Sequence, residues 1–433
     1  MKERISEIAK VLEPDMISFA QKLIRCPSLS GQEKEVALII KEELEKLGYD
    51  EAFIDDYGNV VGIVHGTKPG NTIMYNGHID HVDIGERSEW GKYDPYGGEI
   101  DEVLVQNEAR DAQETAQVIH GRAASDTKGG MACQIYSGAI LAKLKKEGYD
   151  VVGNYIFSGV VFEEPAEQTG MKGLMEDTFP KRGIKVDGVV SCEATGLMLY
   201  LGHRGKTALV VDVEGVSSHG SAPWLGVNAL SKAAKIINKI EEIFAAKTDS
   251  DPQLGKSTIA PTIIKSTPGE MCVVPDRCSV TFDRRFLPWE SAESCVKEIE
   301  DIIEELKKDD PQIKATVRIA EEPRHLYTGK VVTIPNIKEA WKIPPTHPFV
   351  EAAAKGLSDI GETVRFGYWD FGTDLAVICG TYHMAAIGYS PMQELYCHRS
   401  VDMVRIDFMN RALIGNLAIF NKLVLLDKNE FSL

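Results

Sequence analysis

Apolar residues recur every three or four positions in some stretches of the chain and form short continuous runs in others. The first pattern predicts amphipathic helices, and the second predicts buried strands. The expected helices cover residues 5–24, 31–47, 131–146, 348–360 and 406–425, and the expected strands cover residues 59–65, 72–75, 151–162, 186–192 and 385–388. Ser30 and Glu33 have the spacing of a capping box before the second helix. Alternating strands and helices predict an α/β fold.

The pattern changes in the middle of the chain, between residues 202 and 322. Strands are expected there at residues 207–213, 257–266, 277–286 and 315–320, and helices at residues 227–246 and 292–308. The order β-α-β-β-α-β is that of a compact ferredoxin-like unit, which can fold by itself. We therefore predict a first domain formed by residues 1–201 and 323–433, with residues 202–322 inserted into it as a second domain.

Two adjacent carboxylates end the longest of the apolar runs. Glu163 and Glu164 follow the strand expected at 151–162, and Pro165 comes next. Successive side chains of a strand point to opposite faces, so the two glutamates can share one site only if the backbone turns, which Pro165 favours. Two neighbouring carboxylates in a buried site need a cation or a proton. Taken alone, the pair could also be an exposed acidic loop.

Other strand ends and the adjoining loops carry further groups that bind metals. The candidate ligands are His78, Asp126, Glu164, Glu193 and His398. Nitrogen and carboxylate oxygen without sulfur suit zinc, and also cobalt or manganese. Five ligands suit two metal ions that share one bridging carboxylate, with a water between them. A single histidine on a strand is more often structural, but the repeated placement at strand ends favours a metal site.

Composition narrows the functional classes. The net charge of -17 argues against binding of nucleic acid or of an anionic membrane surface. We expect a cytoplasmic protein, because residues 1–13 lack the apolar core of a signal peptide and no apolar run reaches about 18 residues. The eight cysteines are scattered without a CxxC pair, so reduced thiols are expected and not a disulfide frame or a thiolate metal site.

Several motifs together resemble a known family. They are residues 77–80, 121–130, 163–164, 193, 205, 217–223, 283–285, 372–374 and 398. The set is similar, in the same order and from about residue 15 to about 425, to the co-catalytic di-zinc amidohydrolases and exopeptidases. That family includes acetylornithine deacetylase, succinyl-diaminopimelate desuccinylase, aminoacylase-1 and the carboxypeptidase G type. The resemblance implies a mixed-sheet, zinc-exopeptidase-like catalytic domain, and it makes the inserted ferredoxin-like domain a lid through which a homodimer forms.

The same resemblance implies roles for the residues around the metals. Asp126 would bridge two divalent ions, which the resemblance implies to be zinc, with cobalt and manganese as alternatives. The remaining roles are His78 and Glu193 on one ion, Glu164 and His398 on the other, Glu163 as general base and Asp80 as the group that orients His78. Asp80 also fits this role on spacing, because it shares a strand face with His78 and could hold the other imidazole N–H.

Substrate contacts are implied as well. His219 matches a family histidine that stabilises the oxyanion from the other subunit of a dimer, although a surface histidine in a polar loop would look the same. Arg285 matches the arginine that receives the substrate carboxylate, and strand alternation places Arg284 on the opposite face. Gly372 and Thr373 would shape the substrate pocket through their backbone.

Two features depart from the family pattern. Cys272 stands where the family often has an asparagine that helps to hold the substrate carboxylate. His78 and Asp126 are 48 positions apart, because the polar stretch 85–119 forms a long excursion that could be a lid or a subunit contact.

The sequence therefore predicts a metal-dependent hydrolase. It would cleave the amide bond of an N-acyl amino acid or a related small molecule, as a deacetylase or desuccinylase does, by a metal-bridged hydroxide with Glu163 as general base. A di- or tripeptidase using the same groups is the first alternative. A non-catalytic binding protein is the second, but such proteins lose ligands or the base, and this chain keeps them.

Overall fold

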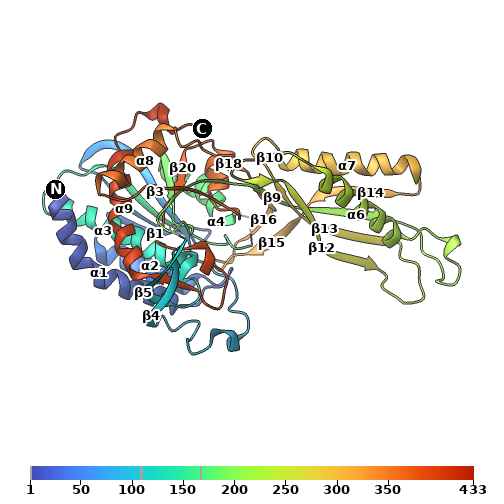
Figure 1. Ribbon diagram of the computed structural model, residues 1–433, viewed down its shortest axis with the longest axis horizontal. Helices are drawn as coiled ribbons and strands as arrows, with labels where there is room; N and C mark the ends of the chain where they lie inside the picture. The colour runs from blue at the N-terminus through green and yellow to red at the C-terminus, as the bar shows by residue number, and fades with distance from the viewer. Residues whose placement is uncertain (1, 108–110, 166–167) are drawn as a thin grey trace.

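The computed structural model describes residues 2–107, 111–165 and 168–433. Figure 1 shows two lobes: a large domain that contains both ends of the chain, and a narrower inserted domain that extends away from it. Each domain has its own hydrophobic core. Within the described residues, no helix is both long and apolar enough to cross a membrane.

A nine-stranded mixed sheet forms the centre of the large domain. Its strands, in spatial order, are β1 (Glu51–Ile54), β2 (Val60–Val64), β6 (Val152–Val160), β3 (Lys68–His78), β7 (Gly188–Ser191), β20 (Ala386–Gly388), β8 (Leu199–His203) and β18 (Trp341–Lys342), with β19 (Phe366–Trp369) paired to β8. The neighbours β6, β3 and β7 are parallel, so their carboxyl ends meet at one edge of the sheet. Ligands in α/β proteins commonly bind at such an edge.

Helices cover this sheet. They are α1 (Lys2–Ile24), α2 (Lys34–Leu47), α3 (Gly129–Lys146), α8 (Pro348–Asp359) and α9 (Ile406–Leu423), with the short helices α4 (Thr169–Gly173) and α5 (Phe179–Arg182). Helix α3 is buried along almost its whole length between α1, α9 and the sheet. Its many small residues, which the sequence shows as Gly, Ala, Ser and Cys, permit this close packing.

A small three-stranded sheet lies beside the large one. It contains β4 (Ile100–Asn107), β5 (Ala112–His120) and β21 (Met403–Arg405), in the order β21-β5-β4. The polar excursion expected at 85–119 therefore includes a β-hairpin, although residues 108–110 lie outside the described residues. Its alternation of apolar and polar residues is that of a strand with one exposed face.

The inserted domain has the expected ferredoxin-like order. Its elements are β9 (Gly205–Glu214), α6 (Ala229–Ala246), β12 (Thr258–Thr267), β13 (Arg277–Phe286), α7 (Ala292–Asp309) and β14 (Lys314–Ile319). The sheet order is β12-β13-β9-β14, and α6 and α7 pack against it and against each other. After the hairpin of β15 (Glu321–His325) and β16 (Val331–Pro335), β17 (Ile337–Lys338) also pairs with β9. The domain boundaries at 202 and 322 stay a prediction.

The capping box expected before α2 is wrong. Glu33 is the N-cap residue of α2 and makes no side-chain cap hydrogen bond. Its carboxylate accepts from the backbone N–H of Gly31, and the hydroxyl of Ser30 donates to Asp80. Ser30 has thus been drawn into a tertiary contact, which local spacing does not reveal.

We predict that Gly77→Ala destabilises the large domain. A Cβ at this position of β3 would lie 2.6 Å from Cys192 Sγ and 2.7 Å from Met131 Cγ, both fully buried. Overpacking of this kind costs about 1–3 kcal/mol of unfolding free energy, measurable as a lower midpoint in guanidinium unfolding. Lys68→Ala, at the exposed start of the same strand, should change the unfolding free energy by less than about 0.5 kcal/mol. Equal midpoints for the Gly77 variant and the parent would contradict the close packing.

Candidate metal centre

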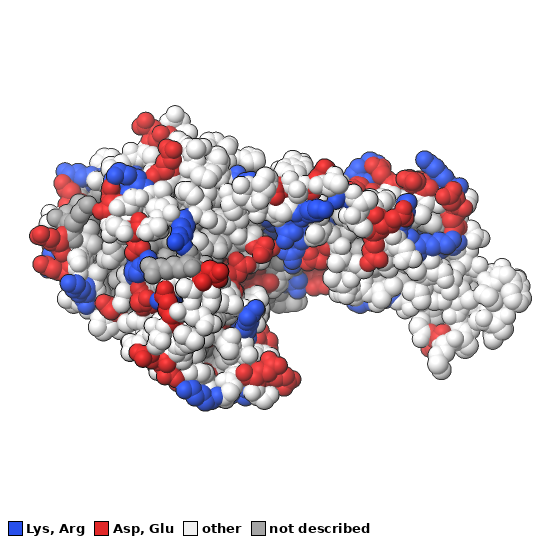
Figure 2. Space-filling model, in the orientation of Figure 1, with Lys and Arg blue, Asp and Glu red and all other residues white. Residues whose placement is uncertain are grey.

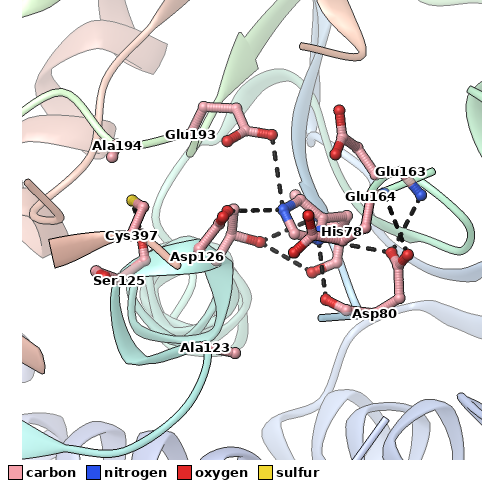
Figure 3. Close-up of polar contacts among 12 residues, drawn as sticks. His78, Asp80, Ala123, Ser125, Asp126, Glu163, Glu164, Glu193, Ala194 and Cys397 are labelled. Carbon is pink, nitrogen blue, oxygen red and sulfur yellow. Dashed lines mark hydrogen bonds and ion pairs between the residues drawn. The ribbon is translucent and has the colours of Figure 1, made fainter. Parts of the chain in front are cut away.

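The five predicted metal ligands lie together at the carboxyl edge of β6, β3 and β7. His78 is the last residue of β3, Glu164 follows β6, and Glu193 follows β7. Asp126 comes from the turn before α3, and His398 from the loop between β20 and β21. Figure 3 shows Asp126 and Glu193 on one side of His78, with Glu163 and Glu164 on its other side.

The ligands form two groups of three that share Asp126. In the first group, His78 Nε2 lies 2.9 Å from Asp126 Oδ1 and 3.7 Å from Glu193 Oε1. In the second group, His398 Nε2 lies 2.9 Å from Asp126 Oδ2 and 3.1 Å from Glu164 Oε2. Because each oxygen of Asp126 faces a different histidine, this carboxylate is placed to bridge two ions.

The charge balance of the site favours divalent cations. Burial raises the pKa of Glu164 to about 7, and the neighbouring charge of Asp126 adds to this effect. Burial also raises the pKa of Glu193 well above its usual range. Hydrogen bonds to Asp126 and Glu164 raise the pKa of His398 to about 11. These carboxylates therefore attract protons or cations strongly, and their nitrogen and oxygen donors are those of a zinc, cobalt or manganese site.

Left-handed backbone positions aim these side chains. Phe162, with a φ of 57°, turns the chain just after β6, and this turn, three residues before Pro165, lets Glu163 and Glu164 face the same site. His398 also has a positive φ, of 59°. Such conformations are uncommon for residues other than glycine and tend to occur at functional sites.

Asp80 connects the two halves of the site. Its carboxylate accepts from the backbone N–H groups of Glu163 and Glu164, at 3.1 and 3.2 Å, and from the hydroxyl of Ser30. His78 Nδ1 lies 3.5 Å from Asp80 Oδ1 and 3.0 Å from the backbone oxygen of Asp80. The hydrogen bond of His78 Nδ1 thus goes to the backbone oxygen of Asp80, with the carboxylate nearby, and the orienting role of this carboxylate stays a prediction. Its hydrogen bonds also fix the turn that carries Glu163.

Asp402, which the sequence pattern does not single out, holds the Asp126 turn. The buried Asp402 carboxylate accepts from the backbone N–H of Ala123 at 2.7 Å, from the backbone N–H of Ser125 at 2.8 Å and from the Ser125 hydroxyl at 2.6 Å. The Asp402 carboxylate also forms an ion pair with Arg122. Nothing in the spacing of the sequence separates this aspartate from a surface carboxylate.

The sequence pattern does not single out Lys338 either. This buried lysine of β17 forms an ion pair with Glu163 and donates to the backbone oxygen of Gly372 at 3.0 Å. Gly372 lies on the pocket wall. Thr373 lies behind that wall, where its N–H donates to His203 Nε2 and its oxygen accepts from Gln168.

A pocket of about 400 Å³ opens over the ligands and lies between the two domains. The inserted domain contributes Lys206 and Arg285 to its lining. Arg285 forms an ion pair with Asp283 on the same strand, at 2.6 Å. Arg284 points the other way, as predicted from strand alternation, and is fully buried against Glu290 and Glu298.

His219 does not reach this pocket within one chain. It lies in the loop after β9, beyond the end of that strand opposite to Lys206, which lines the pocket. Figure 1 shows the inserted domain extending away from the large domain. His219 Nδ1 accepts from the backbone N–H of Ser221, and the loop contacts residues 272–273. Any contact between His219 and the metal ligands must therefore come from another chain.

Comparison with known proteins gives the family. Residues 201–311 match the peptidase dimerisation domain of the M20 family. The chain is also 33% identical over 396 residues to the protein YgeY of Escherichia coli (strain K12), a match that covers 91% of each protein. The chain belongs to the M20 metallopeptidase family. This membership confirms the predicted fold class and the predicted class of enzyme, a hydrolase of amide bonds, against the alternative of a binding protein.

Solved peptidase structures share the fold of this enzyme. Aminopeptidase PepT from Bacillus cereus has a TM-score of 0.67 at 18% identity, covering 95% of this chain and 98% of PepT. The YXEP protein of Bacillus subtilis, described as a dinuclear metal binding peptidase from the M20 family, has a TM-score of 0.67 at 14% identity, covering 96% and 100%. These matches show the shared fold, and none singles out the deacetylase, desuccinylase, aminoacylase or carboxypeptidase G types that the sequence resembled.

We predict that Asp126 and His398 affect metal content differently. The parent should bind about two divalent ions per chain, His398→Ala about one, and Asp126→Ala fewer than one, because Asp126 belongs to both ligand groups. Metal analysis by mass spectrometry after dialysis measures this. His65→Ala, at an exposed histidine paired with Glu51, is the control and should retain two. A His398→Ala variant with full metal content would refute the second group.

Proposed function

We propose that this M20 enzyme is a metal-dependent hydrolase that cleaves the amide bond of an N-acyl amino acid or a related small molecule. The observation that carries the proposal is the position of Asp126 between two ligand groups, with Glu163 on the wall of the same pocket. His78, Asp126 and Glu193 would hold one divalent ion, and Asp126, Glu164 and His398 the other. Zinc suits these ligands best, and cobalt or manganese are alternatives.

Two bound divalent ions would polarise the amide carbonyl and lower the pKa of a bound water toward about 7. Glu163 acts as the general base: it takes a proton from the attacking water and later passes it to the leaving amine. Asp80 positions Glu163 through the backbone N–H, and Lys338 positions the Glu163 carboxylate through their ion pair. Neither group needs to exchange a proton itself.

The inserted domain completes the site in this proposal. Residues 202–322 serve as lid and dimerisation domain, which the match to a peptidase dimerisation domain supports. His219 of the partner subunit would then donate a hydrogen bond to the developing oxyanion, since its own chain holds it away from the pocket. Gly372 lines the pocket directly, whereas Thr373 supports it from behind.

A di- or tripeptidase is the second candidate. PepT, which has the same fold, is described as an aminopeptidase. Cys272 replaces the asparagine expected to contact the substrate carboxylate, and it is exposed in a loop beside His219. The backbone oxygen of Cys272 accepts from the backbone N–H of Gly220. A panel of N-acyl amino acids and of dipeptides with free amino termini, each assayed with zinc, cobalt and manganese, separates the two candidates. If the enzyme hydrolyses no substrate of either class, the proposed function is rejected.

We predict that Glu163→Gln lowers kcat by about 10²–10⁴-fold, because the amide keeps the shape of the side chain but cannot take a proton. Steady-state kinetics on the best substrate of the panel measure the effect, and metal analysis should show unchanged metal content. Glu42→Gln, at an exposed position of α2, is the matched control and should leave kcat unchanged. Unchanged turnover in the Glu163 variant would remove this residue as the base.

We predict that mixed dimers recover activity that neither variant has alone. Glu163→Gln and His219→Ala each disable every site of their own homodimer. In a mixed dimer, one site combines an intact Glu163 with the intact His219 of the partner subunit, so about half of the parent activity should return. Dimers purified through a different tag on each variant provide the measurement. No recovery would contradict a site shared between subunits.

A further inference from the structure

Three cationic side chains form a row on the inserted domain, facing the metal ligands. Arg285 of β13 and Lys338 of β17 are both register partners of Lys206, which lies on β9 between them. Side chains at paired positions of adjacent strands point to the same face of a sheet. All three line the pocket over the metal ligands, and Figure 2 shows Lys and Arg gathered where the two lobes meet.

Two members of this cationic row already have partners. Arg285 contacts Asp283 with two of its nitrogens, at 2.6 and 3.2 Å. Lys338 forms an ion pair with Glu163 and donates to Gly372. Neither charge therefore needs a further anion.

Lys206 differs from both neighbours. Within the described parts of the chain, its ammonium group has neither a hydrogen bond nor an ion pair. The side chain is half-buried, and burial lowers the pKa of Lys206; the nearby charge of Asp283 opposes this shift, whereas the charges of Arg285 and Lys338 add to it. Like charges at paired positions destabilise a sheet. Asp283 and Glu163 offset two of the three positive charges of the row, so an anionic ligand would balance the third.

We infer that Lys206 is the principal binding residue for the carboxylate of the substrate. Arg285 was expected in that role, but its guanidinium group is neutralised by Asp283, and it would instead serve as a second, weaker contact. The substrate would then span the two domains, with its amide at the metal ligands and its carboxylate at Lys206. The pocket volume of about 400 Å³ suits a small molecule of this kind. This inference rests on the proposed function and names the chemistry of the substrate.

The test compares substrates that differ only in this charge. Zinc-loaded enzyme is assayed with N-acetyl-L-alanine and N-acetyl-L-alaninamide, and with glycyl-L-alanine and its carboxamide. The parent should prefer the carboxylate of each pair. Lys206→Met should reduce this preference about 10–100-fold, the loss expected for one charge-assisted hydrogen bond, mainly through KM. Lys206→Arg should retain most of it, because a charged donor remains. Lys185→Met, at an exposed lysine of the large domain, is the control and should retain all of it.

The possible results separate the inference from the proposed function. Hydrolysis with an unchanged preference in Lys206→Met overturns the role of Lys206 and leaves the hydrolase intact. If the parent hydrolyses neither pair, these compounds are not substrates. The binding of N-acetyl-L-alanine, measured by calorimetry, then tests the role of Lys206. Binding at least tenfold weaker in Lys206→Met, with binding by Lys185→Met unchanged, supports it, and equal binding overturns it.

Discussion

The repulsion among buried carboxylates is the constraint on which the rest of this structure depends. Asp126, Glu164 and Glu193 approach one another at the edge of the central sheet, where little water can screen their charges. The neighbouring histidines offset part of this electrostatic repulsion, and bound cations would be needed to offset the rest. The parallel order of β6, β3 and β7 creates the meeting point, and the hydrogen bonds of Asp80 and Asp402 hold the turns against this repulsion.

Much of the metal centre could be predicted from the sequence, because strand ends are visible in it. His78, Glu164 and Glu193 each follow an apolar run, and parallel strands bring such ends together. The alternation along β13 also separated Arg284, which is buried, from Arg285, which faces the pocket. The catalytic roles proposed for the metal ligands and for Arg285 rest on the resemblance to a family. The M20 match supports this resemblance at the level of the family.

Other residues could not be found in this way. Lys206 and Lys338 reach the pocket because β17 and β9 pair in one register, and the two residues are far apart in sequence. Asp402 holds the turn at Ala123, which lies 279 positions earlier in the sequence. Ser30 fits a capping pattern but donates to Asp80. In each case the deciding contact is tertiary, whereas spacing along the chain reports only local structure.

The two-residue strand β17 has a mechanical consequence. The backbone of Lys338 is paired with the inserted domain, whereas its ammonium group grips Glu163 and Gly372 of the large domain. A rotation that opens the cleft would pull this side chain away from the carboxylate that it steadies. In the proposed reaction, Lys338 would therefore couple the orientation of Glu163 to the relative position of the two domains.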